Sequence, residues 1–229
     1  MAQIAEKKQE ISDNLIQIYR KFTLSELRLY HMYLSRIDPK DKASRYVMIS
    51  LDEYANMAGI QVKVSDFRNI CQKLLLHTIT VPEMKGNENF PLFMVCSIIQ
   101  NELVGARYFQ LNVHDKALPL VIDFRKKYAN FPVKNIVKLK SPYQIRMYSL
   151  LKQYETAGEF TITIRNLRES LGIKDTECTE LKYFRRDLLN PVIRALGANT
   201  DLICNYRKKA VGPHGKWLSI MFKIECRKK

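Results

Sequence analysis

The order of helix and strand patterns occurs twice in this 229-residue sequence, and this repetition constrains the fold more than any single motif. Residues 23–37 carry apolar side chains at helical spacing, after a Thr-x-x-Glu capping box. A strand pattern at 45–50, helix patterns at 50–60 and 65–77, and β-type segments follow. The same order returns in the second half, so the chain is expected to hold two copies of one unit.

Two details connect the copies. One helix of each copy ends in Gly-Ile, at Gly59 and Gly172, and glycine commonly follows the last turn of a helix. The next helix then carries Phe-Arg, at 67–68 and 184–185. A helix, a strand, two helices and a β-hairpin is the order of a winged helix. The predicted fold class is α+β, with two tandem winged-helix domains.

The second copy begins at Ser141, which is suited to cap a helix that has Pro142 at its first position. Tyr143 and Tyr154 of this helix are expected in the core of the second unit. We therefore predict domains at 1–125 and 126–229, with the connection near Lys126–Lys138.

The charge is unequal between these halves. Residues 1–125 hold 16 basic and 14 acidic side chains, whereas residues 126–229 hold 22 basic and 9 acidic ones. An excess of positive charge in one half indicates a surface that faces a polyanion. Double-stranded DNA is the expected partner.

Sequence patterns for catalysis are weak. The sequence contains no phosphate-binding G-x-x-x-x-G-K-[ST] motif, and its four histidines are far apart. The adjacent pair Asp52-Glu53 lies in the first turn of a helix, where carboxylates stabilise the helix dipole. Five dispersed cysteines indicate reduced thiols rather than a zinc site. We expect no enzyme activity, no cofactor and no metal.

The sequence has no uncharged apolar run of about 18 residues, and its first 14 residues lack the apolar centre of a secretory signal. We therefore expect a protein of the bacterial cytoplasm without a membrane partner.

The helix predicted at Glu180–Leu196 is the main candidate for DNA reading. Its inward stripe is Phe184, Leu188, Val192 and Leu196. The outward residues predicted to bind DNA are Lys182, Arg185, Arg186, Asn190 and Arg194. Such a helix fits the major groove, where arginine can bind guanine through two hydrogen bonds. Asp187 is expected either to orient an arginine at helical spacing or to accept a hydrogen bond from cytosine.

The hairpin that follows is the expected wing. Its candidate phosphate contacts are Arg207, Lys208, Lys209 and Lys216, while Trp217 is expected to pack on the sheet. In the first unit, fewer contacts of the backbone type are expected, from Lys63, Arg68, Asn69, Gln72 and Lys73. The strand at 91–100 is apolar on both faces, so either a helix or another subunit is expected to cover it.

Four blocks within residues 138–224 resemble the iteron-binding replication initiators of theta-replicating plasmids. They read LKSPYQIRMYSLLKQY, FTITIRNLRESLGI, YFRRDLLNPVIRAL and TDLICNYRKKAVGPHGKWLSIMFKI. The run Leu-Leu-Asn-Pro-Val-Ile is similar to the family's Leu-Asp-Pro-Ala-Ile segment and accounts for Pro191 inside a helix. In the first half, the resemblance lies in the order of elements.

The resemblance implies that a monomer binds repeated origin sites, opens the adjacent duplex indirectly and recruits the host initiator, helicase and primase. It also implies a dimer, formed through the first domain, that represses the protein's own gene at an operator. Three alternatives stay open at this stage: a dedicated transcriptional repressor, an origin-nicking enzyme, and a winged-helix scaffold that binds only proteins.

Overall fold

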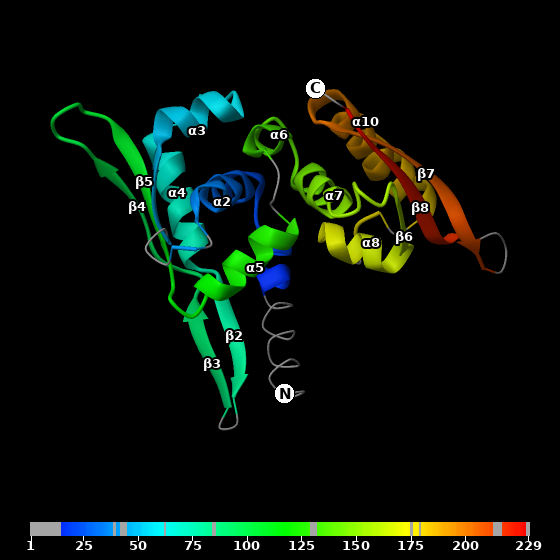
Figure 1. Cartoon of the computed structure of the whole chain (residues 1–229), viewed down its shortest axis with the longest axis horizontal. Coiled ribbons are helices and arrows are strands. Elements are labelled where there is room, and N and C mark those ends of the chain that lie inside the picture. Colours follow the sequence, from blue (N-terminus) through cyan, green and yellow to red (C-terminus); the bar gives the residue numbers. More distant parts are fainter. Residues whose placement is uncertain are drawn as a thin grey trace. The chain divides into compact units, whose positions relative to one another are not determined.

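The structure is a computed structural model of the chain, and it describes residues 15–38, 40–41, 45–61, 63–83, 86–128, 132–174, 176–178, 180–212 and 217–227. The chain divides into two compact units, Met1–Val133 and Lys134–Lys229 (Figure 1). The α+β fold class and the repeated winged-helix order predicted from the sequence are both confirmed. The division lies inside the predicted connection but after residue 125, because a helix of the first unit continues through that position.

The first unit contains a helical segment at 15–21, helices α2 (Leu24–Arg36), α3 (Leu51–Ala58), α4 (Val64–Leu75) and α5 (Leu118–Tyr128), and strands β1 (Tyr46–Ser50), β2 (Thr78–Glu83), β3 (Gly86–Pro91), β4 (Phe93–Gln100) and β5 (Arg107–Val113). Strands β1, β5 and β4 form an antiparallel sheet in that order. Strands β2 and β3 form a separate hairpin that extends from the end of α4 (Figure 1). Neither β3 nor α5 was predicted from the sequence.

One face of the three-stranded sheet is buried by helices of the same unit. Side chains alternate along a strand, so Val47, Ile49, Phe109 and Leu111 share this face, and all four are buried. Helix α4 packs directly on β4. The apolar strand is thus covered by a helix of its own unit on this face, whereas Met94 of the same strand stays exposed.

The helix ends of the first unit follow the sequence signals with one exception. Thr23 and Glu26 form the complete capping box predicted for α2. Gly59 ends α3 in the left-handed conformation, with φ of 62°. Ser65, the first residue of the helix pattern in the sequence, lies inside α4. The helix begins one residue earlier, after Lys63, whose backbone N–H donates to the Asp66 carboxylate.

The second unit contains helices α6 (Val133–Val137), α7 (Pro142–Lys152), α8 (Ile164–Leu171), α9 (Leu181–Tyr183), η2 (Phe184–Leu189) and α10 (Asn190–Asn199), and strands β6 (Glu159–Thr163), β7 (Leu202–Val211) and β8 (Trp217–Cys226). The strand order in its antiparallel sheet is β6-β8-β7. Ser141 caps α7 and Gly172 ends α8, as predicted. Helix α6, which was not predicted, lies in the expected connection.

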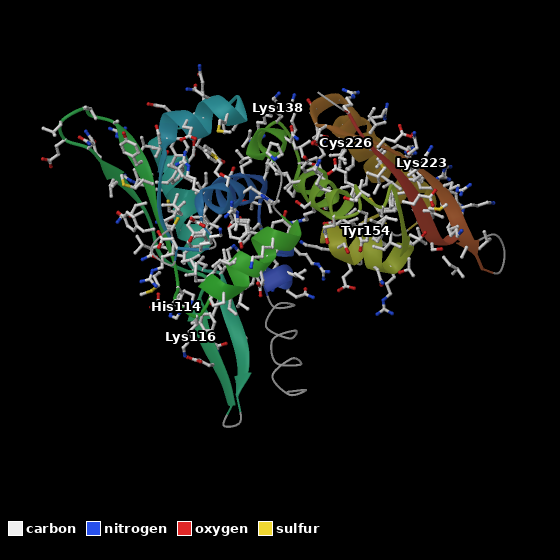
Figure 2. All side chains as sticks on the ribbon, viewed as in Figure 1. His114, Lys116, Lys138, Tyr154, Lys223 and Cys226 are labelled. Atoms are coloured by element: carbon white, nitrogen blue, oxygen red, sulfur yellow. The ribbon has the colours of Figure 1, made fainter. Side chains whose placement is uncertain are left out.

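Tyr143 and Tyr154 were predicted to lie in the core of the second unit. The tyrosine at the centre of that core is instead Tyr148. Tyr148 is fully buried; its hydroxyl accepts from Asn135 and donates to Asp201. Tyr143 is half-buried and donates to Glu177, while Tyr154, labelled in Figure 2, is also half-buried and stacks on Phe160. Tyr148 lies five residues after Tyr143, about 140° around the helix, so it is not on the stripe of Tyr143 and Tyr154 from which the core was predicted.

Within the described residues, no helix has the length and apolar character needed to cross a membrane.

Candidate DNA interface

The predicted reading helix is helical from Leu181 to Asn199, but its middle is a π-helix rather than an α-helix. We call the whole segment α9-η2-α10 the reading helix. The backbone N–H of Asn190 donates to the carbonyl of Arg185, five residues earlier. Pro191 explains the widened turn, because proline has no N–H to donate and its ring clashes with the carbonyl four residues before it in a regular helix.

The inward side of the reading helix agrees with the sequence. Phe184, Leu188, Val192 and Leu196 are buried, as is Leu189. Four of the five predicted DNA-binding side chains are exposed: Lys182, Arg186, Asn190 and Arg194. The apolar stripe therefore anchors the helix and leaves a polar, mostly basic face outside.

Arg185 is less exposed than these four because it packs against the hairpin of its own unit. Its guanidinium carbon lies 4.4 Å from the centre of the Trp217 ring, and its Nε donates a long hydrogen bond of 3.5 Å to the hydroxyl of Tyr206. Trp217 therefore packs against an arginine of the reading helix, in a cation–π contact, as well as belonging to the sheet. The arginine is turned partly toward protein and partly toward solvent.

Arg186 and Asp187 form an exposed ion pair. The Nε and Nη2 atoms of Arg186 donate to the two carboxylate oxygens of Asp187, at 2.5 and 2.8 Å. This hydrogen bonding lowers the pKa of Asp187 and raises the pKa of Arg186. Asp187 thus orients an arginine, which was one of its two predicted roles. The partner, however, is the preceding residue in the chain rather than an arginine at helical spacing.

The wing is the hairpin of β7 and β8. Tyr206 and Lys208 lie opposite Phe222 and Ile220, whose side chains face the helices, so strand alternation places them on that same face. Arg207 lies opposite Met221 and contacts its sulfur, on the other face of the sheet. Lys209 is exposed beyond a strand irregularity. Lys216 lies outside the described residues.

A cleft of about 610 Å³ separates the reading helix from the wing. It is lined by Arg185, Asn190, Ile193, Arg194, Asn205, Tyr206 and Trp217. Tyr206 was not among the sequence predictions. Tyr206 follows the buried Cys204 at the two-residue spacing of a strand, as a core residue would. No sequence pattern therefore marks Tyr206 as part of this site.

In the first unit, all the candidate residues are exposed on α4 or just before it. They are Lys63, Arg68, Asn69, Gln72 and Lys73. This helix is the counterpart of the reading helix, and its outer side is available for contacts with a phosphate backbone.

One group of possible metal ligands occurs among the described residues: Glu155, Asp201 and Cys226, the last at the end of β8 (Figure 2). The ammonium group of Lys152 already binds this group, with its Nζ 2.8 Å from oxygens of both Glu155 and Asp201. A cation is therefore supplied by the protein itself, and the arrangement is that of a structural ion pair network.

The family described as "Initiator Replication protein, WH1" has a model that matches residues 10–152, which is more than half of the chain. The chain belongs to this family. The match covers the first unit, where the sequence resemblance rested on the order of elements, and it extends into α7.

Two solved structures are similar in fold to this member of the family. The crystal structure of Pi initiator protein in complex with iteron DNA matches with a TM-score of 0.73 and 16% identity, over 94% of this chain and 96% of that one. Domains 2 and 3 of RctB match with a TM-score of 0.53 and 12% identity, over 90% and 83% of the two chains. At these identities, the likeness shows a shared fold across both units.

A curated relative is an uncharacterized 27.6 kDa protein of Escherichia coli, 20% identical over 110 residues. The alignment covers 48% of this chain, and the chain spans 45% of that relative's length.

Proposed function

We propose that this chain initiates plasmid replication by binding repeated double-stranded DNA sites in an origin, without catalysing a reaction itself. The observation that carries the proposal is the reading helix, whose apolar side is buried while its basic side is exposed beside a lysine-bearing wing. A helix and a wing in this arrangement can contact base edges and the phosphate backbone together. Membership of the replication initiator family supports the same function.

The division of labour between the units follows their charges. The second unit holds most of the excess positive charge and the candidate base-reading residues, so it supplies sequence-specific binding. The first unit presents a few polar and basic side chains on α4 and supplies contacts to the backbone. The matching fold of the Pi initiator, whose structure was solved with iteron DNA, supports binding through both units.

We further propose that the first unit forms a dimer that represses the protein's own gene. The sheet face away from the helices carries Tyr46 and Met48 of β1, exposed by 46% and 41%. Strand β4, at the other edge of the same sheet, carries Met94, exposed by 55%. Exposed apolar side chains on a sheet are typical of a protein interface. A second copy of this chain is the proposed occupant.

Host proteins complete the proposed role. The sequence has no phosphate-binding loop of a helicase or ATPase, so strand separation and priming require other proteins. The host initiator, helicase and primase are the proposed partners. The proposed place of action is the bacterial cytoplasm.

The test is a gel-shift and footprinting series with the DNA that flanks this gene, at two salt concentrations. The expected result is protection of direct repeats, which is lost in the Arg185→Ala, Arg186→Ala double variant while its circular dichroism is unchanged. Protection of a single inverted operator alone would identify a dedicated repressor. A covalent protein–DNA adduct formed with a divalent metal would identify a nicking enzyme. Absence of DNA affinity even at low salt would favour a protein-binding scaffold.

A further inference from the structure

The π-helical turn brings Arg185 and Asn190 to the same side of the reading helix. An α-helix has about 3.6 residues per turn, so residues five apart project about 140° from each other. In the wider turn, Asn190 donates its backbone N–H to the carbonyl of Arg185, and its side chain lies nearly above that residue. Both side chains therefore reach the same residue of the wing, Tyr206.

The hydroxyl of Tyr206 connects these two side chains in a chain of hydrogen bonds. Arg185 Nε lies 3.5 Å from the hydroxyl oxygen, and that oxygen lies 2.5 Å from Oδ1 of Asn190. The ring of Trp217, 4.4 Å from the guanidinium carbon, also packs against Arg185. The reading helix and the wing are thus joined through polar groups that line the cleft between them.

The chemistry of the three groups fixes the direction of this chain. An arginine side chain can only donate hydrogen bonds, so Tyr206 accepts from Arg185. A tyrosine hydroxyl has one hydrogen to donate, and Tyr206 donates it to the amide oxygen of Asn190. The amide nitrogen of Asn190 then faces solvent with both hydrogens, because Asn190 is exposed and that nitrogen has no partner in the described part of the chain.

We propose that Tyr206 is a specificity-determining residue, which turns the amide oxygen of Asn190 toward the wing and leaves its amide nitrogen to donate to DNA. This inference rests on the proposed function as a DNA reader. A free asparagine recognises adenine by accepting from N6 while donating to N7. With its oxygen held toward Tyr206, Asn190 presents its amide hydrogens to acceptors of guanine or thymine in the major groove and is kept out of the orientation that the paired contact to adenine requires.

The same chain of hydrogen bonds uses only Nε of Arg185, and the two terminal nitrogens have no hydrogen-bond partner in the described part of the chain. These nitrogens can donate to O6 and N7 of guanine, the contact that arginine forms most often in the major groove. Arg185 and Asn190 together are therefore a pair of donors, and the DNA position that they read is expected to present acceptors.

The experiment selects binding sites from a random duplex library with the full-length protein, in four versions. These are the wild type, Tyr206→Phe, Asn190→Ala, and the double variant. Tyr143→Phe is the matched control, since it also removes one tyrosine hydroxyl bonded to a side chain of the second unit, that of Glu177, but outside the cleft. Binding of the selected duplexes is then measured with each of the four bases at every position.

The expected result is a single position at which Tyr206→Phe gains a preference for adenine of about tenfold over the wild type. The gain should be absent in Tyr143→Phe and in both variants that lack Asn190. A merely structural role for Tyr206 would weaken binding to all sequences without changing the preferred base.

Two results would overturn the inference while leaving the proposed function intact. One is an unchanged base preference in Tyr206→Phe, and the other is a loss of selectivity with no gain of adenine at any position. If the wild type itself selects no common sequence, the proposed function fails and the inference fails with it.

Discussion

The guanidinium group of Arg186 is paired with the carboxylate of Asp187, the next residue in the chain, and lies 4.9 Å from the centre of the Tyr183 ring. Adjacent residues on a helix do not face each other, so the arginine must fold back along the helix surface to form this pair. Arg186 is thereby held in an ion pair on the protein, whereas the terminal nitrogens of Arg185, whose guanidinium packs on Trp217, have no hydrogen-bond partner among the described residues. The two neighbouring arginines are not equivalent.

Replacing Asp187 with asparagine should release Arg186 and strengthen binding to DNA of any sequence. The change removes a negative charge that faces phosphate, and it frees one cation to contact the backbone. The slope of log affinity against log salt concentration should become steeper by about one. Fluorescence anisotropy with non-specific duplexes at several salt concentrations measures this.

The control for this change is Glu225→Gln, which also removes the acid of an exposed ion pair, with Lys223 at 3.4 Å on the wing. It should leave the slope unchanged. If Asp187→Asn instead loses selectivity for a cytosine without gaining affinity, the alternative role predicted for Asp187, as an acceptor from cytosine, is correct.

Replacing Lys208 with alanine should weaken binding to specific and non-specific DNA by the same factor. Lys208 lies on the helix-facing side of the wing, where a phosphate contact positions the protein without reading sequence. The salt slope should decrease by about one.

Lys223→Ala is the comparison for Lys208→Ala, since Lys223 is an exposed lysine of the same hairpin (Figure 2), on the opposite face. It should have little effect on affinity. A loss of affinity confined to one sequence in Lys208→Ala would contradict a backbone role.

Replacing Met48 with aspartate should shift the protein from dimer to monomer. Met48 is exposed on the outer sheet face of the first unit, opposite Gln110, and a charge there would be costly in an apolar interface. Sedimentation velocity measures the change. Leu103→Asp is the control, because Leu103 is 96% exposed between β4 and β5. Unchanged sedimentation of the Met48 variant would place the dimer contact elsewhere.

His31 should make the first unit less stable as the pH falls from 7 to 5. Burial lowers the pKa of His31 to about 3, whereas the same group in an unfolded chain has a pKa of about 6.5. Between these values the unfolded state binds a proton that the folded state does not, so acid favours unfolding. The free energy of unfolding should fall by about 2 kcal/mol between pH 7 and pH 5.

His31→Gln removes this titration and should flatten the dependence, even if it lowers stability at every pH. Urea unfolding followed by circular dichroism gives the comparison. Trp217, the single tryptophan of the chain, lies in the second unit, and its fluorescence in the same samples serves as an internal control. If the free energy of unfolding depends on pH equally in the wild type and in His31→Gln, His31 is not the cause of the loss of stability in acid.

Much of the fold could be predicted from the sequence because local signals specify it. The capping box at Thr23, the helix end at Gly172 and the buried stripe that begins at Phe184 all depend on residues within a few positions of each other. The repeated order of elements then gave the winged-helix fold. Ser65 shows the limit of such signals, because a backbone contact with Asp66 started the helix earlier.

The candidate site was predicted only in part. Exposed basic residues follow from helical spacing, and four of the five on the reading helix are exposed as expected. The contacts of Arg185 could not be predicted, because its partners Tyr206 and Trp217 come from strands that are brought beside it only by the fold. Spacing also assumed a uniform α-helix, and the π-turn changed which residues share a face.

The sequence by itself determined that two winged-helix units would form and that the second would carry a basic helix, since periodicity, caps and charge are properties of neighbouring residues. Tertiary structure alone decided which donors and acceptors of that helix remain free for DNA. The physical reason is that each polar group has a fixed number of hydrogen bonds, and partners distant in sequence occupy some of them. Tyr206, sixteen residues from Asn190, donates to the amide oxygen of Asn190 and so holds that oxygen toward the wing.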